Sequence, residues 1–336
     1  MRYLSVCSGI EAATVAWHPL GWEPVAFSEV DAFPSAVLQH HYPTVPNWGD
    51  MTKFQEWPDA DVDVLVGGTP CQSFSIAGLR AGLADPRGSL MLTYLGLAGR
   101  YRPRWVVWEN VPGVLSSNGG RDFASLLRGL AECGYGFAYR VLDAQHFGVP
   151  QRRRRVFVVG HRGDWRRAAA ILFERDSVPG HPQKTVEQGE GPTWWNGDPV
   201  SQTLDAVLHK GQMMPEKNRF PVIAVGDVSS SPATATRMEI APSAAWITPS
   251  VTVLDRLRTM CMSTAKTTMG SSGRVGLRRV TPTECERLMG FPDNYTRVPF
   301  RAKPASDTPR YKALGNSMAV PVMRWIGTRI QMVEAL

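Results

Sequence analysis

A cysteine on a tight loop is the first residue in this sequence that could do chemistry. Cys71 lies in a segment rich in glycine and proline, residues 67–75, directly after the apolar residues 62–66. Such an apolar run predicts a buried strand, and an α/β fold carries its reacting groups just beyond the carboxyl ends of its strands. A free thiol there is a candidate nucleophile. For an isolated Pro-Cys-Gln sequence, a structural turn with a small buried cysteine is the commoner interpretation.

A carboxylate and a run of arginines could work with that thiol. Glu109 ends a second apolar stretch, and in a parallel sheet it would open onto the same edge as Cys71. A thiolate nucleophile and a carboxylic acid in one pocket form a working pair. Four consecutive arginines follow Gln151, and in an extended chain Arg153 and Arg155 point to the same side as Gln151. A solvated basic face is the usual interpretation of such a run, but an apolar strand follows it here, so we expect part of it to face the site.

The N-terminal residues predict the opening unit of a nucleotide-type fold. Residues 3–6 predict a short strand, Cys7-Ser8-Gly9 predicts a turn, and the chain from there to about Gly21 predicts a helix. The Gly-x-Gly-x-x-Gly fingerprint is absent, so neither a dinucleotide pyrophosphate nor a nicotinamide oxidoreductase is indicated. An adenosine ligand without a pyrophosphate remains compatible with this turn.

Acidic residues follow at positions suited to such a ligand. Glu29 ends the second predicted strand, about twenty positions after the glycine turn, where α/β folds carry an acceptor for ribose hydroxyls. Asp31 is better suited to the N-terminus of the next helix, where the dipole favours a carboxylate. Asp50 follows a weak third strand. On spacing alone it could accept a hydrogen bond from an adenine amino group or cap a turn.

Composition and charge narrow the class of protein. The chain has 336 residues, 43% of them hydrophobic, enough for one large domain and a smaller one. No apolar run approaches a membrane span and the N-terminus lacks a signal-peptide layout, so we expect a cytoplasmic protein without a membrane partner. Five widely spaced cysteines with no Cys-x-x-Cys pair argue against a disulfide framework and a metal site. A net charge of +7 favours a polyanionic partner.

Two segments differ from the rest of the chain in composition and hydrophobic periodicity. Residues 78–88 form a glycine-rich polar stretch, which predicts either a lid beside the candidate nucleophile or an ordinary surface connection. From 161 to 276 the chain is rich in Pro, Gly, Ser and Thr and shows little periodicity, which indicates a loop-rich second domain or an insertion. Residues 226–275 are especially irregular, which is compatible with partial disorder, with a divergent ordered element and with a segment altered by a local frameshift.

Order returns in the C-terminal residues. Thr281, Pro282 and Glu284 predict a helix N-terminus with a capping box. Residues 315–317, Gly-Asn-Ser, predict a tight polar turn at the start of the final helix, and Pro321 is expected to interrupt that helix.

Five sequence blocks, taken in order, resemble the cytosine-C5 DNA methyltransferase family. They are Cys7-Ser8-Gly9 with Glu29, Gly68-Thr69-Pro70-Cys71-Gln72, Glu109-Asn110-Val111, Gln151-x-Arg153-x-Arg155 and Gly315-Asn316-Ser317. Each block is weak or moderate alone, but their joint order and spacing argue strongly against an accidental match. Residues 281–292 also resemble the family's ninth motif. Cys7 and Glu11 stand where relatives usually have an aromatic residue and a further glycine.

The resemblance implies an α/β fold with a Rossmann-like, S-adenosylmethionine-dependent methyltransferase core. This core would have a mixed, mostly parallel sheet and would be joined by a smaller, loop-rich target-recognition domain. The catalytic and cofactor-binding core would span residues 1–160 and the recognition domain 161–276. A C-terminal segment, 277–336, would return to the core.

The resemblance also implies catalytic roles for individual residues. Cys71 would attack C6 of a cytosine, and Glu109 would protonate or hydrogen-bond N3. Arg155 would hold O2 of the base, and Arg153 would brace the Cys71 loop.

Further residues are expected to bind the cofactor and the base. Glu29 would take the ribose hydroxyls of S-adenosylmethionine, and Asp50 would take its adenine amine. The expected cofactor-binding residues are Cys7, Gly9, Ile10, Glu29, Val30, Asp50, Met51, Pro70, Leu90, Asn316 and Met318. The expected substrate-binding residues are Gln72, Ser75, Asn110, Val111 and Gln151.

The implied function is transfer of a methyl group from S-adenosylmethionine to C5 of a flipped-out cytosine in double-stranded DNA, through a covalent Cys71–C6 intermediate. The implied partners are double-stranded DNA and, in a restriction–modification system, a cognate endonuclease; a monomer without a metal is expected. One alternative is the tRNA-directed branch, whose Cys-Phe-Thr signature is absent from this sequence. Another is a non-catalytic DNA-binding protein with a methyltransferase-like core, against which the intact Cys71 and Glu109 argue.

Overall fold

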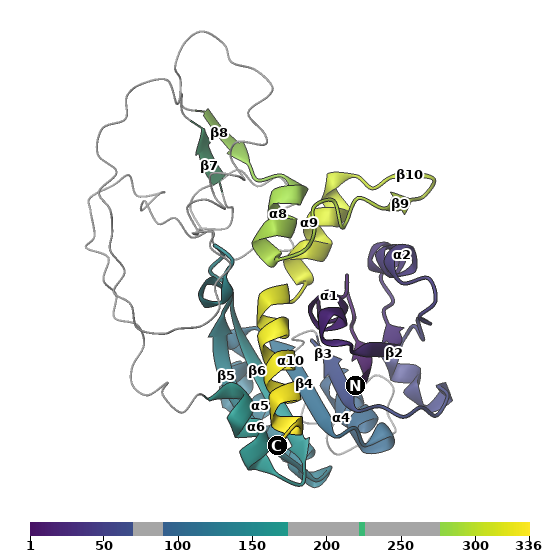
Figure 1. The fold of residues 1–336 in the computed structure, drawn as a ribbon, viewed down its shortest axis with the longest axis vertical. Helices are drawn as coiled ribbons and strands as arrows, with labels where there is room; N and C mark the ends of the chain where they lie inside the picture. The colour runs from purple at the N-terminus through teal and green to yellow at the C-terminus, as the bar shows by residue number, and fades with distance from the viewer. Residues whose placement is uncertain (70–89, 174–221, 226–275) are drawn as a thin grey trace, which may run out of the picture.

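The computed structural model describes residues 1–69, 90–173, 222–225 and 276–336. Within them, six strands form one sheet in the order β2-β1-β3-β4-β6-β5 (Figure 1). The strands are β1 (Arg2–Val6), β2 (Glu23–Ser28), β3 (Val64–Gly67), β4 (Trp105–Asn110), β5 (Tyr135–Asp143) and β6 (Arg154–Arg162). β1 pairs in parallel with β2 and β3, and β3 pairs in parallel with β4. β6 runs antiparallel to both β4 and β5, so the predicted mixed, mostly parallel sheet is confirmed.

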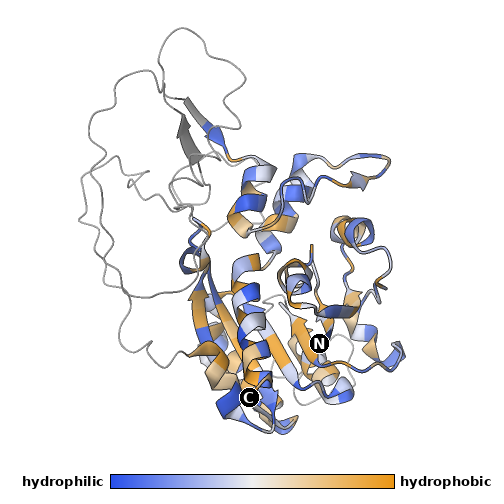
Figure 2. Ribbon diagram, in the orientation of Figure 1, coloured by the Kyte–Doolittle hydropathy of each residue, from blue (hydrophilic) through white to orange (hydrophobic). Residues whose placement is uncertain are grey.

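Helices cover both faces of the sheet. α4 (Leu90–Tyr101) and α5 (Arg121–Glu132) pack on one face, and α1 (Ala12–Trp17), α6 (Trp165–Leu172) and α10 (Val320–Glu334) pack on the other. Neighbouring residues of one strand serve different faces: Val106 and Trp108 belong to the first core, Trp105 and Val107 to the second. This two-residue alternation is what an extended chain requires. Figure 2 shows the apolar strands between these helices.

Shorter elements complete the described chain. α2 (Ala32–His41) follows β2, and 3-10 segments span Met51–Glu56, Pro112–Leu115, Ser117–Gly120 and Ala144–Phe147, with one more, His18–Leu20, after α1. β7 (Val222–Val225) and β8 (Gly276–Arg279) form an antiparallel pair. The predicted weak third strand before Asn47 is wrong. Asn47 makes only an isolated bridge to Phe27, because the chain there turns towards the Met51–Glu56 segment instead of extending.

α6 belongs to the packed core although it follows residue 160. Ile171 and Leu172 are fully buried in the same core as α1 and α10. Arg329 of α10 donates hydrogen bonds to the carbonyls of Ile171, at 2.6 Å, and Ala170, at 2.5 Å. The part of the chain that packs on the sheet therefore extends beyond residue 160.

Residues 282–334 contain the C-terminal helices, and α10 packs on the sheet. α8 (Pro282–Met289) begins with the predicted capping box between Thr281 and Glu284. A short hairpin, β9 (Pro299–Phe300) with β10 (Lys303–Pro304), then precedes α9 (Asp307–Asn316). The expected interruption at Pro321 is wrong. Pro321 lies in the first turn of α10, where no intrahelical N–H is needed.

No helix in the described ranges is long and apolar enough to cross a lipid bilayer.

Candidate active site

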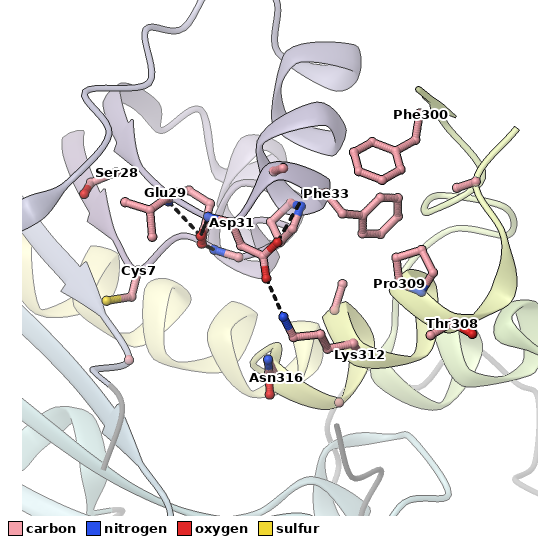
Figure 3. A pocket seen from close by; sticks show the side chains of 18 of the residues that line it. Cys7, Ser28, Glu29, Asp31, Phe33, Phe300, Thr308, Pro309, Lys312 and Asn316 are labelled. Atoms are coloured by element: carbon pink, nitrogen blue, oxygen red, sulfur yellow. Dashed lines mark hydrogen bonds and ion pairs between the residues drawn. The ribbon is translucent and has the colours of Figure 1, made fainter. Parts of the chain in front are cut away.

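The carboxyl ends of β1, β2, β3 and β4 open onto one cavity of about 940 Å³ (Figure 3). One side of this cavity, here called the strand wall, carries Gly9, Glu29, Asp50 and Glu109. The opposite side, the C-terminal wall, carries Phe300 of the hairpin and Thr308, Lys312 and Asn316 of α9. Because β6 is antiparallel to β4, the beginning of β6 reaches the same edge and brings Arg153 and Arg155 into the cavity.

The turn after β1 is held by the carboxylate that follows β2. Gly9 has a φ of 57°, a left-handed conformation that glycine adopts without strain. Its N–H donates to Glu29 Oε2 at 2.8 Å. The N–H groups of Val30 and Asp31 donate to Glu29 Oε1 at 2.9 and 2.7 Å. A carboxylate offers about four acceptor positions, so these donors leave capacity for a ligand hydroxyl, and the contact with a ribose stays a prediction.

Asp50 fills one of the two roles that spacing left open. Its Oδ1 accepts hydrogen bonds from the backbone and the hydroxyl of Thr52, at 2.9 and 2.8 Å, so it caps the 3-10 segment that follows. It also lines the cavity, and its contact with an adenine amine stays a prediction. Burial, together with the charges of Glu29 and Asp50, raises the pKa of Cys7 to about 12. Cys7 is therefore a neutral thiol in the wall and not a nucleophile.

Glu109 and Arg155 form a largely enclosed ion pair. Arg155 Nε lies 3.1 Å from Glu109 Oε1, and only 14% and 11% of the two side chains are exposed. Burial raises the pKa of Glu109, although the neighbouring Arg155 and Arg153 oppose that shift. A raised pKa favours the protonated form of this carboxyl, which is the form that could give a proton to a base.

The residues next to Glu109 fix the chain that leads to Cys71. The side chain of Asn110 donates to the carbonyl of Thr69 at 2.9 Å, and Trp108 Nε1 donates to Thr69 Oγ at the same distance. A Cβ added to Gly68 would lie 2.9 Å from Glu109 Oε2, so a larger residue at this position would displace the Glu109 carboxyl. The segment before the predicted nucleophile is therefore anchored to β4. Pro70, Cys71, Gln72 and Ser75 lie outside the described residues.

The arginine run alternates as predicted. Gln151 and Arg153 are buried, whereas Arg152 and Arg154 are exposed. Arg153 Nη2 donates to the carbonyls of Gly315 and Ser317, at 3.0 and 2.5 Å, and so holds the junction between α9 and α10. Its predicted contact with the Cys71 loop falls outside the described residues.

The structure places most of the other predicted residues on the cavity, with three exceptions. Lining the cavity are Cys7, Val30, Met51, Leu90, Asn110, Val111 and Asn316. Ile10 is fully buried in the core, and Met318 packs against that core without lining the cavity. Gln151 is fully buried and donates to the carbonyl of Leu288 at 3.0 Å, so it supports α8 instead of facing the base.

Sequence reasoning missed most of the C-terminal wall. Phe300, Thr308 and Lys312 line the cavity, and none was predicted to do so. One signal was available: Thr308, Lys312 and Asn316 are spaced by four, and residues at that spacing share a helix face. This spacing was not used because residues 315–317 were expected to form a turn. In the structure α9 continues to Asn316.

The residues present fit S-adenosylmethionine. The cavity volume falls within the roughly 300–1,000 Å³ of small-molecule sites. Glu29 and Asp50 supply acceptors for hydroxyl and amino groups, and Gly9 leaves the backbone open to close approach. Among the described residues no group of three potential metal ligands occurs.

Comparison with known proteins identifies the family. The family model for C-5 cytosine-specific DNA methylase matches residues 1–332. The chain is 36% identical to a protein of Escherichia phage P1 named DNA N-6-adenine-methyltransferase, over 98% of this chain and 61% of that protein. The chain thus spans less than two thirds of that relative's length. It is 30% identical to the type II methyltransferase M.SsoII of Shigella sonnei, over 98% of this chain and 79% of the relative.

Solved structures share the fold. The Dnmt2 methyltransferase of S. pombe superposes with a TM-score of 0.61 at 17% identity, and each chain is covered to 99%. A putative DNA modification methyltransferase from an E. coli prophage gives a TM-score of 0.55 at 16% identity, with full coverage of both chains. At these identities the likeness shows the fold alone. The family match over nearly the whole chain goes further, and the chain belongs to the C-5 cytosine-specific DNA methylase family.

Proposed function

We propose that this protein methylates C5 of cytosine in double-stranded DNA, with S-adenosylmethionine as the methyl donor and a covalent Cys71–C6 intermediate. The observation that carries the proposal is the enclosed Glu109–Arg155 pair, 3.1 Å apart, beside the anchored start of the Cys71 loop. A proton donor and a cation at this place are what nucleophilic attack on a cytosine requires.

The proposed reaction begins with addition to the base. C5 of cytosine is a poor nucleophile while the ring is aromatic. The Cys71 thiolate forms a bond to C6, and Glu109 gives a proton to N3, so the ring electrons are left in an enamine that is nucleophilic at C5. Arg155 donates to O2 of the base and keeps the Glu109 carboxyl oriented. A charged donor aimed at developing charge in an enclosed site is a strong catalytic device.

The second half restores the aromatic ring. When bound, S-adenosylmethionine would supply the methyl group to C5, and breaking of its S–CH3 bond would leave S-adenosylhomocysteine. The C5 proton then leaves to a base, N3 returns its proton, and the electrons of the C5–H bond expel the thiolate from C6. The net change exchanges the C5 hydrogen for a methyl group and releases one proton, and Glu109 ends the cycle protonated as it began.

The proposal includes a flipped base and a separate recognition domain. A cytosine inside a duplex cannot reach a buried carboxyl, so the base must rotate out of the stack at a cost of about a few kcal/mol. We infer that residues beyond α6, up to 276, read the DNA sequence, because the described residues through α6 and from α8 onward are committed to the core and the cavity. A monomer and a cognate endonuclease stay predictions.

Trapping on a modified base tests the mechanism. Duplex DNA that contains 5-fluorocytosine, incubated with the protein and S-adenosylmethionine, should give a covalent complex that survives denaturing electrophoresis, because fluorine cannot leave C5 as a proton. The Cys71→Ala protein should give none. Cys133→Ala is the matched control and should still form the complex, since Cys133 lies at the end of α5, away from the cavity. Absence of a complex on DNA carrying every sequence context would exclude the covalent route.

A second candidate function is methylation of adenine N6. The name of the phage P1 relative favours it. An adenine amine needs no covalent activation, so the Glu109–Arg155 pair would have no catalytic role in that reaction. Mass spectrometry of nucleosides from treated DNA and tRNA separates the cases: 5-methylcytosine in DNA supports the proposal, N6-methyladenine supports the second candidate, and 5-methylcytosine in tRNA alone moves the case to the tRNA-directed branch. Bisulfite sequencing then gives the recognition sequence.

A further inference from the structure

The face of α9 that carries Asn316 also lines the cavity with residues that precede Asn316. Thr308, Lys312 and Asn316 follow one another at intervals of four residues, so they form one stripe along the helix. All three line the cavity, and Figure 3 shows them along the helix face opposite Glu29 and Asp31. Asn316 is an expected cofactor residue, and Lys312 therefore lies one turn from it on the same face.

Lys312 reaches across the cavity to the opposite wall. Its Nζ lies 2.6 Å from Asp31 Oδ2. The two side chains are 49% and 41% exposed, and an ion pair this accessible contributes little to folding. Asp31 also caps the start of α2, so it is committed to the strand wall. A lysine ammonium has three donors, and Lys312 therefore keeps donors for a second acceptor.

Charge is distributed unevenly along the cavity. The strand wall carries the carboxylates Glu29, Asp31, Asp50 and Glu109, of which Glu109 is paired with Arg155, whereas the opposite wall carries Lys312 together with Arg301 and Lys303 of the hairpin. S-adenosylmethionine is polarised in a matching way. Its adenine amine, ribose hydroxyls, sulfonium and ammonium are donors or cations, and its α-carboxylate is its only anion. The carboxylates suit the first set, and the carboxylate of the ligand needs a cation.

We propose that Lys312 binds the α-carboxylate of S-adenosylmethionine, while Asp31 holds the ammonium in place from the opposite wall. This inference rests on the proposed function, because it assigns a further residue to the same cofactor site. Lys312 thereby distinguishes ligands that carry the amino-acid carboxylate from those that lack it. Asp31 is a positioning residue in this arrangement and does not touch the ligand.

Binding of two product analogues tests the assignment without any catalytic readout. Isothermal titration calorimetry is done with S-adenosylhomocysteine and with its decarboxylated form, which keeps the amine and lacks only the carboxylate. The wild-type protein should bind the first more tightly. In Lys312→Gln, affinity for S-adenosylhomocysteine should fall about tenfold or more, affinity for the decarboxylated form should stay unchanged, and the preference should disappear.

Two controls make the result specific. Lys53→Gln removes the same charge from an exposed lysine that does not line the cavity, and it should leave both affinities unchanged. Asp31→Asn should lower the affinity for S-adenosylhomocysteine less than Lys312→Gln does, because the ammonium of Lys312 remains. Thermal unfolding of each variant shows that the fold is retained.

Each other outcome overturns the inference. An equal loss of affinity for both analogues in Lys312→Gln would mean that Lys312 has a structural role. An unchanged affinity for both would mean that Lys312 does not contact the ligand. If Lys303→Gln, and not Lys312→Gln, selectively lowers the affinity for S-adenosylhomocysteine, then the hairpin binds the carboxylate of the ligand. A loss of DNA affinity alone would make Lys312 a phosphate contact. If the wild-type protein binds neither analogue, the proposed cofactor itself is wrong, which is distinct from a failure of Lys312 alone.

Discussion

The two walls of the cavity hold their side chains by different means. On the strand wall, Glu29 accepts three backbone N–H donors and Glu109 stands on a fully buried strand. On the C-terminal wall, Lys312 is half exposed and depends on a single carboxylate. Phe300 meets Phe33 through one edge-to-face contact, with ring centroids 5.3 Å apart. Under the proposed function, the groups that would react are therefore built into the sheet, whereas Lys312 and Phe300 stand on the added C-terminal segment.

The C-terminal wall is nevertheless anchored at its base. Glu286 of α8 accepts from the backbone of Thr296 at 2.8 Å and from Arg310 of α9 at 3.1 Å. Arg310 also donates to the hydroxyl of Thr296 at 2.8 Å. This buried network fixes the position of α9 relative to α8. The weak contacts of the C-terminal wall are thus confined to the surface that faces the cavity.

The largest effect should come from the strand wall. Glu109→Gln keeps the shape of the side chain and its contact with Arg155 but cannot deliver a proton to N3. We expect the rate of methyl transfer to fall by roughly 10²–10⁴-fold, while the affinity for S-adenosylhomocysteine changes little. Single-turnover transfer of a labelled methyl group to DNA measures the rate. A variant that keeps the wild-type rate would remove Glu109 from the mechanism.

A second prediction concerns Glu11, which lies behind the strand wall. Glu11 has a φ of 63° and is only 1% exposed. Its carboxyl accepts from Ser5 Oγ at 2.5 Å and from Thr14 Oγ at 2.6 Å, so it ties β1 to α1 on either side of the cofactor turn. Burial raises the pKa of Glu11 from 4.5 to about 7, although these hydrogen bonds oppose the shift.

The sign of the pH effect follows from that shift. A folded-state pKa above the unfolded value means that the folded protein holds the proton more tightly, so stability is greatest below pH 4.5 and is lost as pH rises through about 7. Relative to Glu11→Gln, the wild type should lose about 2–3 kcal/mol of unfolding free energy between pH 5 and pH 8. Urea denaturation of both proteins across this range gives the difference. Parallel pH profiles would show that Glu11 is not the titrating group.

The third prediction is a smaller effect at the ribose site. In Glu29→Gln one carboxylate oxygen becomes an amide NH2 group, which cannot accept a hydrogen bond from the backbone of Gly9, Val30 or Asp31 or from a ribose hydroxyl. Loss of one hydrogen bond to the ribose should weaken S-adenosylhomocysteine binding roughly tenfold. Calorimetry measures this change, and the fold should remain intact because Glu29 lies at the edge of the sheet. Unchanged affinity would mean that the ribose does not meet Glu29.

The strand wall could be predicted from sequence because its signals are local. A strand, a glycine turn and a helix occur consecutively around Gly9, and Glu29 and Glu109 each end an apolar run. Parallel strands then bring those ends to one edge without any further information. The alternation of Gln151 and Arg153 with exposed arginines was readable for the same reason, since an extended chain fixes the direction of each side chain.

The C-terminal wall could not be predicted in the same way. Asp31 and Lys312 are 281 positions apart, and no local pattern records that they meet. The single bridge at Asn47 and the buried position of Gln151 are likewise set by packing between distant segments. Glu11 occupies a left-handed position that usually favours glycine, and only its burial and its contacts with Ser5 and Thr14 explain its place there.

The smallest effect should come from the aromatic contact between the walls. Phe33 lies on α2 and is 4% exposed, so its truncation also disturbs the core. A double-mutant cycle with Phe33→Ala, Phe300→Ala and the double variant isolates the pair from that larger loss. The rings meet at 80°, a geometry that contributes about 0.5–1.5 kcal/mol beyond area burial. Urea denaturation should therefore give a coupling energy of about 1 kcal/mol. A coupling near zero would mean that the hairpin does not rest on α2 in solution, and the contrast between a rigid wall and a lightly held one would become stronger.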